Sequence, residues 1–169
     1  LVVRGFEATG GVPEEAKVAD AVEYFLNHYD AHISESSRVF PGLLATLSAL
    51  RGQGCTFGIC TNKFERFSRK LLRDLGILDH FAAIVGGDTL SVRKPDPGHI
   101  LATVERMGAR PEAAVMIGDS SNDVRAARAA GVPVVAVSFG YTATPARELG
   151  ADHVIDSLSE LPAVLAGMT

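Results

Sequence analysis

Apolar residues along the chain recur with two different periods, which predicts strands that alternate with helices. Short apolar runs predict five strands, at residues 55–60, 82–85, 113–117, 134–137 and 153–155. Apolar positions spaced three or four residues apart predict the helices, at 43–50, 63–75, 97–107, 122–130, 145–149 and 158–165. Strands alternating with helices of this length are typical of an α/β fold with a mostly parallel, doubly wound, Rossmann-like sheet.

The N-terminal region has a different pattern. Residues 13–33 carry apolar side chains at helical spacing, and Pro13 suits the first position of a helix. Residues 1–5 contain no helix or strand start signal, and the polar residues 34–38 interrupt the helical pattern. We therefore expect a separate helical region that is joined to the α/β region by a hinge.

Composition excludes several classes of function. The 169 residues carry a net charge of −4 and no basic run, which argues against a nucleic-acid partner. No apolar run approaches the roughly 20 residues of a membrane span, so we expect no membrane association and a cytoplasmic location. Cys55 and Cys60 lie five residues apart on one predicted strand, where they point to opposite faces, so we expect free thiols.

The most informative motif is residues 118–123, which read Gly-Asp-Ser-Ser-Asn-Asp directly after an apolar strand. Ligands of open α/β sheets bind at the carboxyl ends of the strands. The carboxylates of Asp119 and Asp123 suit a hard cation such as Mg²⁺ at such a strand end. Helix capping could account for one or two of these residues, but not for both carboxylates at this position.

Two further strand ends carry compatible chemistry. Thr61 and Asn62 follow the first predicted strand of the α/β region, and either can donate a hydrogen bond to a phosphoryl oxygen. The predicted strand at 82–85 leads through a loop to Lys94. Fixed by the proline that follows it, Lys94 presents a compact positive charge. By themselves, Thr61 and Asn62 could equally cap a helix and Lys94 could be a solvated loop residue. The three strand ends together favour a site for a phosphoryl group.

The order and spacing of these motifs resemble those of the haloacid dehalogenase-like hydrolases, and of the bacterial phosphoglycolate phosphatases among them. The segments that carry the resemblance are 39–42, 60–63, 86–88, 93–97, 118–120 and 138–141. The resemblance implies a Mg²⁺-dependent phosphatase that acts on a small phosphate monoester through an aspartyl-phosphate. It assigns Asp119 and Asp123 to the metal, catalytic roles to Thr61, Lys94 and Asp123, and phosphate binding to Thr61, Asn62 and Lys94.

The resemblance also implies a domain organisation. Residues 1–35 resemble the second half of a helical cap domain, and residues 36–169 resemble the core domain without its first strand. The nucleophile of that family lies in an Asp-x-Asp after the first strand, and no Asp-x-Asp occurs in this sequence. We therefore expect the 169 residues alone to lack hydrolase activity, and a monomer or homodimer as the assembly.

Three alternatives stay open at this stage. The chain could be a phosphate- or partner-binding module without catalysis, or a receiver-type domain, which also uses Asp, Thr and Lys at strand ends. Within the same superfamily, a phosphosugar mutase would use the same residues. His28 and His32 have the spacing of a helical metal pair, but a solvated helix face is expected there.

Overall fold

The computed structural model describes residues 2–168 and divides into two compact units, with the boundary between Ser37 and Arg38. Leu1 and Thr169, the outer ends of the two predicted domains, lie outside the described residues. The interpretation of the first unit as half of a cap domain stays a prediction.

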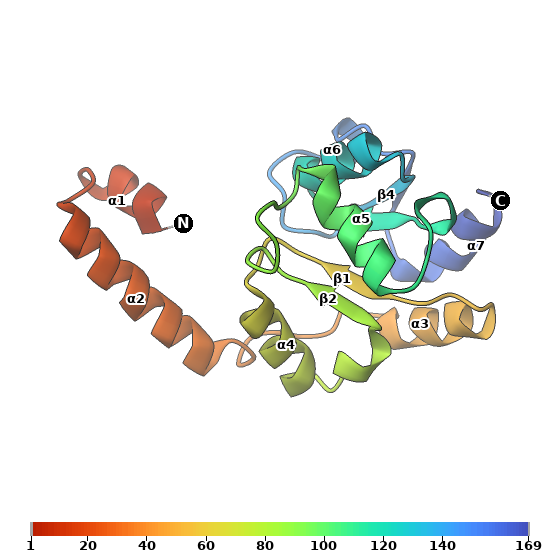
Figure 1. Cartoon of the computed structure of the whole chain (residues 1–169), viewed down its shortest axis with the longest axis horizontal. Coiled ribbons are helices and arrows are strands. Elements are labelled where there is room, and N and C mark those ends of the chain that lie inside the picture. Colours follow the sequence, from red (N-terminus) through yellow and green to blue (C-terminus); the bar gives the residue numbers. More distant parts are fainter. Residues whose placement is uncertain (1, 169) are drawn as a thin grey trace. The chain divides into compact units, whose positions relative to one another are not determined.

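The described residues of the N-terminal unit form two helices, α1 (Val2–Thr9) and α2 (Glu15–His32) (Figure 1). Helix α1 was not predicted, because residues 1–5 carry no helix start signal, although Val2, Val3 and Phe6 give it an apolar side at helical spacing. Helix α2 begins at Glu15 rather than at Pro13, because the backbone of Glu14 is not helical and Glu14 occupies the N-cap position.

Residues 38–168, the described part of the second unit, contain five short strands, and every strand pair among them is parallel. Strand β1 (Gly58–Cys60) pairs with β2 (Ala83–Val85) in one sheet. Strand β4 (Val134–Val137) lies between β3 (Met116–Gly118) and β5 (His153–Ile155) in the other. The predicted parallel α/β class is confirmed, but the strands form a two-stranded and a three-stranded sheet rather than one sheet.

Helices cover both faces of the three-stranded sheet, as a doubly wound fold requires (Figure 1). Val134 packs with α5 (Pro97–Arg106) and α6 (Ser121–Ala130) in one apolar cluster. Val135 and Val137 belong to a second cluster, with residues of α3 (Leu43–Gly52) and α7 (Leu161–Ala166). Neighbouring residues of β4 therefore point to opposite layers, and both sides of the strand are buried.

The remaining elements are α4 (Glu65–Asp74) and four short 3₁₀ turns, at Leu78–His80, Pro111–Ala113, Ala146–Glu148 and Leu158–Glu160. The helix predicted at 145–149 is thus a single 3₁₀ turn, and the one predicted at 158–165 begins as 3₁₀ and becomes α-helical at Leu161. Cys55 and Cys60 are free, as predicted. Within residues 2–168, no helix has both the length and the apolar character needed to cross a membrane.

Candidate active site

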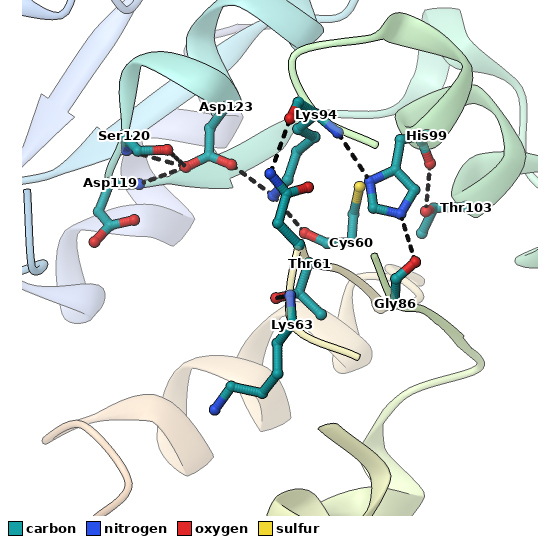
Figure 2. A network of polar contacts seen from close by, with 11 residues as sticks. Cys60, Thr61, Lys63, Gly86, Lys94, His99, Thr103, Asp119, Ser120 and Asp123 are labelled. Atoms are coloured by element: carbon teal, nitrogen blue, oxygen red, sulfur yellow. Dashed lines mark hydrogen bonds and ion pairs between the residues drawn. The ribbon is translucent and has the colours of Figure 1, made fainter. Parts of the chain in front are cut away.

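The predicted site residues come together in one pocket at the carboxyl ends of β1 and β3. The loop before α5 supplies Lys94, so three separate segments of the chain contribute to the pocket (Figure 2). The residues that line it are Thr61, Asn62, Lys94, Asp119, Ser120, Asn122 and Asp123. All five residues singled out from the sequence as site residues are among them.

Lys94 and Asp123 form a buried ion pair at the floor of this pocket. The Lys94 Nζ lies 2.6 Å from Oδ1 of Asp123, and both side chains are only 7% exposed. The same ammonium donates to the carbonyl oxygen of Cys60, at the end of β1. The Lys94 charge is therefore held between β1 and α6 by two acceptors.

The second oxygen of Asp123 is also fully engaged. Oδ2 accepts from the backbone N–H groups of Asp119 and Ser120, at 3.1 and 3.0 Å, and from the Ser120 hydroxyl at 2.7 Å. Burial alone would raise the pKa of Asp123, but the Lys94 charge and these hydrogen bonds outweigh it, so the pKa is lowered. Asp123 is thus an ionised carboxylate whose two oxygens both accept from protein donors.

Gly118 provides the space that Asp123 needs. A Cβ atom at position 118 would lie 2.5 Å from the Cβ and Cγ atoms of Asp123. Only glycine therefore lets the first turn of α6 fold its carboxylate back over the end of β3. This turn is closed by a capping box between Ser120 and Asp123.

Asp119 is held by a segment that is distant in sequence. Its Oδ2 accepts from the backbone N–H of Tyr141 at 2.7 Å, and a Cβ at Gly140 would lie 2.2 Å from the Cβ of Asp119. The ring of Phe139 packs edge-on against Phe40, with 5.1 Å between ring centroids, which anchors the loop after β4. Residues 138–141 were among the segments that carry the resemblance, but no role was predicted for them, although a glycine between two aromatic residues shortly after a buried strand was a usable signal.

Thr61 and Asn62 differ in what they offer the pocket. The Oγ1 of Thr61 accepts from the backbone N–H of Lys63 at 3.2 Å, so its hydroxyl proton is left for another acceptor. The Nδ2 of Asn62 instead donates to the carbonyl oxygen of Lys94 at 2.8 Å. In this structure Asn62 therefore fixes the Lys94 loop with the amide group that was expected to bind phosphate.

Two glycines after β2 bring Thr61 and Asn62 into place. A Cβ at Gly86 would lie 2.3 Å from the backbone nitrogen of Glu65, and one at Gly87 would lie 2.3 Å from the carbonyl oxygen of Asn62. Residues 62–65 can pack so closely against the end of β2 only because both positions lack a side chain. The carboxylate of Asp88 adds a hydrogen bond to the Glu65 N–H, at 2.7 Å.

The donor set fits a magnesium ion better than a transition metal. Within residues 2–168, no three His, Cys, Asp or Glu side chains gather as a metal cluster. Of the two carboxylates in the pocket, Asp123 already accepts from protein donors at both oxygens, whereas the only protein hydrogen bond found for the Asp119 carboxylate within these residues goes to Oδ2. Oδ1 of Asp119 can therefore face a cation, and Mg²⁺ is commonly held by one or two carboxylates together with waters and substrate phosphate.

Sequence comparison connects this chain with one family. The model of the haloacid dehalogenase-like hydrolases matches residues 6–131. The chain is 43% identical over 165 residues to the phosphoglycolate phosphatase of Agrobacterium fabrum, across 98% of this chain and 71% of that protein. It is also 43% identical over 165 residues to the phosphoglycolate phosphatase of Rhodospirillum rubrum, across 95% of this chain and 68% of that protein.

Solved structures of similar proteins have the same fold. A crystal structure described as a predicted phosphoglycolate phosphatase from Haemophilus somnus superposes with a TM-score of 0.88 at 27% identity, across 94% of this chain and 71% of that one. CbbY from Rhodobacter sphaeroides, solved in complex with phosphate, superposes with a TM-score of 0.79 at 26% identity, across 95% of this chain and 72% of that one.

Proposed function

Because the chain belongs to the haloacid dehalogenase-like hydrolases, we propose that its pocket is the phosphoryl site of a Mg²⁺-dependent phosphatase. The phosphate monoester we propose as the substrate is phosphoglycolate. The observation that carries the proposal is the meeting of Thr61, Lys94 and Asp119 in one pocket, from three separate segments of the chain. The relatives named phosphoglycolate phosphatases support the choice of substrate.

Each residue has a distinct part in this proposal. Lys94, a fixed ammonium at the pocket floor, stabilises negative charge on the phosphoryl oxygens. The Thr61 hydroxyl donates to one of those oxygens, and Asn62 keeps the Lys94 loop in place. Asp119 holds the Mg²⁺, with Asp123 orienting both Lys94 and the backbone N–H of Asp119. When bound there, Mg²⁺ would neutralise charge on the transferring group.

We propose that the nucleophile is a residue outside this sequence of 169 residues. An aspartyl-phosphate needs a free carboxylate in line with the phosphorus, and both pocket aspartates have other roles. Asp123 is committed to Lys94 and to three further donors, and Asp119 is assigned to the metal. The absence of an Asp-x-Asp agrees with this assignment.

The proposed location is the cytoplasm, which fits two free cysteines.

A panel of phosphate monoesters, assayed with the full-length protein, tests the function and the substrate. We expect Mg²⁺-dependent release of phosphate, with a kcat/KM for phosphoglycolate at least about tenfold above that for hexose phosphates. Higher kcat/KM for a hexose phosphate, or its conversion to an isomer without phosphate release, would favour the mutase alternative. No turnover of any monoester would overturn the proposal.

The contact between Gly140 and Asp119 gives a prediction for metal binding. In Gly140→Ala, the added methyl group must displace the Asp119 side chain, because a Cβ at position 140 would lie 2.2 Å from the Asp119 Cβ, far inside van der Waals contact. Residues that orient a metal ligand typically contribute about 10–100-fold to metal affinity, and we expect a loss in that range. Isothermal titration with Mg²⁺ measures it without depending on activity.

Gly52→Ala is the matched control for this experiment. Gly52 ends α3, and a Cβ there would meet no other atom within 4 Å. This variant should bind Mg²⁺ as the wild type does. Equal affinity in both variants would show that Gly140 does not position Asp119.

A further inference from the structure

No role was predicted for His99 from the sequence, yet its ring contacts the backbone of the pocket residue Lys94. His99 lies in the first half of α5 and is completely buried. Its Nδ1 lies 3.3 Å from the backbone nitrogen of Lys94, and its Nε2 lies 3.0 Å from the carbonyl oxygen of Gly86 (Figure 2). The ring therefore links the Lys94 loop to the end of β2.

These two partners define the protonation state of the ring. A backbone N–H can only donate, so Nδ1 must accept from Lys94. A carbonyl oxygen can only accept, so Nε2 must carry the proton that bonds to Gly86. A doubly protonated ring would set an N–H at Nδ1 against the N–H of Lys94. Only the neutral Nε2–H tautomer satisfies both contacts.

The surroundings of the ring favour this neutral form. Burial lowers the pKa of His99, and the nearby Lys94 charge acts in the same direction. The hydrogen bond to Gly86 and the Asp96 carboxylate oppose this, but the pKa stays below its ordinary value. The ring is therefore neutral at neutral pH, as the geometry requires.

We propose that His99 is a positioning residue for Lys94, because it ties the Lys94 backbone to β2 while Asn62 ties it to β1. The Lys94 N–H bonds to His99, and the Lys94 carbonyl oxygen accepts from Asn62 at 2.8 Å. With both backbone groups held, the side chain starts from a fixed point and reaches Cys60 and Asp123 in one geometry. The consequence for catalysis rests on the proposed phosphatase function; the clamp itself does not.

Two variants separate the two contacts of the ring. In His99→Asn, the side-chain oxygen takes the place of Nδ1 and can still accept from Lys94, while the bond to Gly86 is lost. In His99→Gln, the side-chain amide group reaches toward Gly86, and the Lys94 N–H loses its acceptor. His99→Leu removes both contacts. If the ring only filled space, His99→Asn would not hold the Lys94 loop better than His99→Gln.

Amide hydrogen exchange at Lys94, measured by NMR on the full-length protein, reads out the clamp without reference to activity. We expect slow exchange of the Lys94 amide in the wild type and in His99→Asn, and fast exchange in His99→Gln and His99→Leu. The ¹⁵N signals of the wild-type ring should identify the Nε2–H tautomer. Exchange at Lys94 that does not depend on residue 99, or a ring protonated at Nδ1, would overturn the proposal.

Phosphatase kinetics give the second readout. A small misplacement of a catalytic group can cost up to about 10²-fold in rate, so we expect kcat to fall about 10–100-fold in His99→Gln and His99→Leu, and less in His99→Asn. His153→Asn, an exposed histidine at the start of β5, is the control and should leave both readouts unchanged. Wild-type kcat in His99→Leu would refute the positioning role.

The two readouts also separate this proposal from the proposed function. If the exchange pattern is as expected but the wild type hydrolyses no phosphate monoester, the clamp stands and the proposed function fails. If the wild type is a phosphatase but neither kcat nor exchange at Lys94 responds to residue 99, the proposed function stands and the clamp fails.

Discussion

Asp119→Asn in the full-length protein is expected to lose Mg²⁺-dependent phosphatase activity by about 10²-fold or more, at any Mg²⁺ concentration. Asparagine keeps an oxygen that can accept from the Tyr141 N–H, so the loop after β4 should stay in place. What is removed is the negative charge and the second carboxylate oxygen, which the proposal assigns to Mg²⁺. The fold should therefore survive while the metal site is lost.

The measurement is a Mg²⁺ titration of kcat/KM, accompanied by thermal unfolding without metal. Asp79→Asn is the matched control, because Asp79 is exposed and lies in the 3₁₀ turn that precedes β2, at the strand end opposite the pocket. It should behave as the wild type in both measurements. If Asp119→Asn reaches wild-type activity within a few-fold at saturating Mg²⁺, Asp119 is not the metal ligand.

The meeting of the site residues was predictable from the sequence, for a general reason. Strands in a parallel sheet end at the same edge, so chemistry placed directly after apolar runs must gather there. Thr61 follows β1 and Asp119 follows β3, and each run was visible from its apolar residues alone. Spacing in sequence was therefore enough to predict the neighbourhood of the pocket, although not the contacts within it.

Several contacts escaped prediction because they join residues that are far apart in sequence. Nothing near Asp119 indicates that the Tyr141 N–H donates to it, and nothing near Lys94 indicates that Asn62 donates to the Lys94 carbonyl oxygen. His99 stood alone in the sequence, and its role follows from the position of Gly86, thirteen residues earlier. Such partners depend on how elements pack, which a periodicity of apolar residues does not specify.

The pattern of apolar residues also did not predict where each strand begins and ends, or how many sheets the strands form. The apolar run covers residues 55–60, but pairing with β2 begins only at Gly58. The strand is therefore limited to Gly58–Cys60. An apolar run predicts burial, whereas a strand boundary depends on the partner's hydrogen bonds. The same limit explains why the pattern indicated a parallel class without indicating that β1 and β3 belong to different sheets.

Lys94→Met is expected to reduce both stability and activity, for two separable reasons. It leaves the Asp123 carboxylate buried without its partner, and breaking a buried ion pair in this way typically costs about 3–5 kcal/mol of unfolding free energy. It also removes a preorganised charge from the phosphoryl site, which typically costs about 10²–10³ in rate. Lys94→Arg should also lose much of the activity, because a planar guanidinium cannot replace a compact ammonium between Cys60 and Asp123.

The double variant Lys94→Met/Asp123→Asn distinguishes the two losses. Replacing both partners removes the unpaired buried charge, so the double variant should recover much of the stability lost in Lys94→Met. Its activity should stay about 10²–10³ below wild type, because the charge that faces the phosphoryl group is still absent. Urea unfolding in Mg²⁺-free buffer, alongside kcat for the same samples, measures both effects.

Lys70→Met provides the matched control. Lys70 pairs with Asp74 on the exposed side of α4, at 2.9 Å, and exposed pairs of this kind contribute about 0–1 kcal/mol. The control should therefore be close to the wild type in stability and in rate. If activity returns together with stability in the double variant, Lys94 serves the fold rather than the reaction. Lys94 would then not be part of the phosphoryl site.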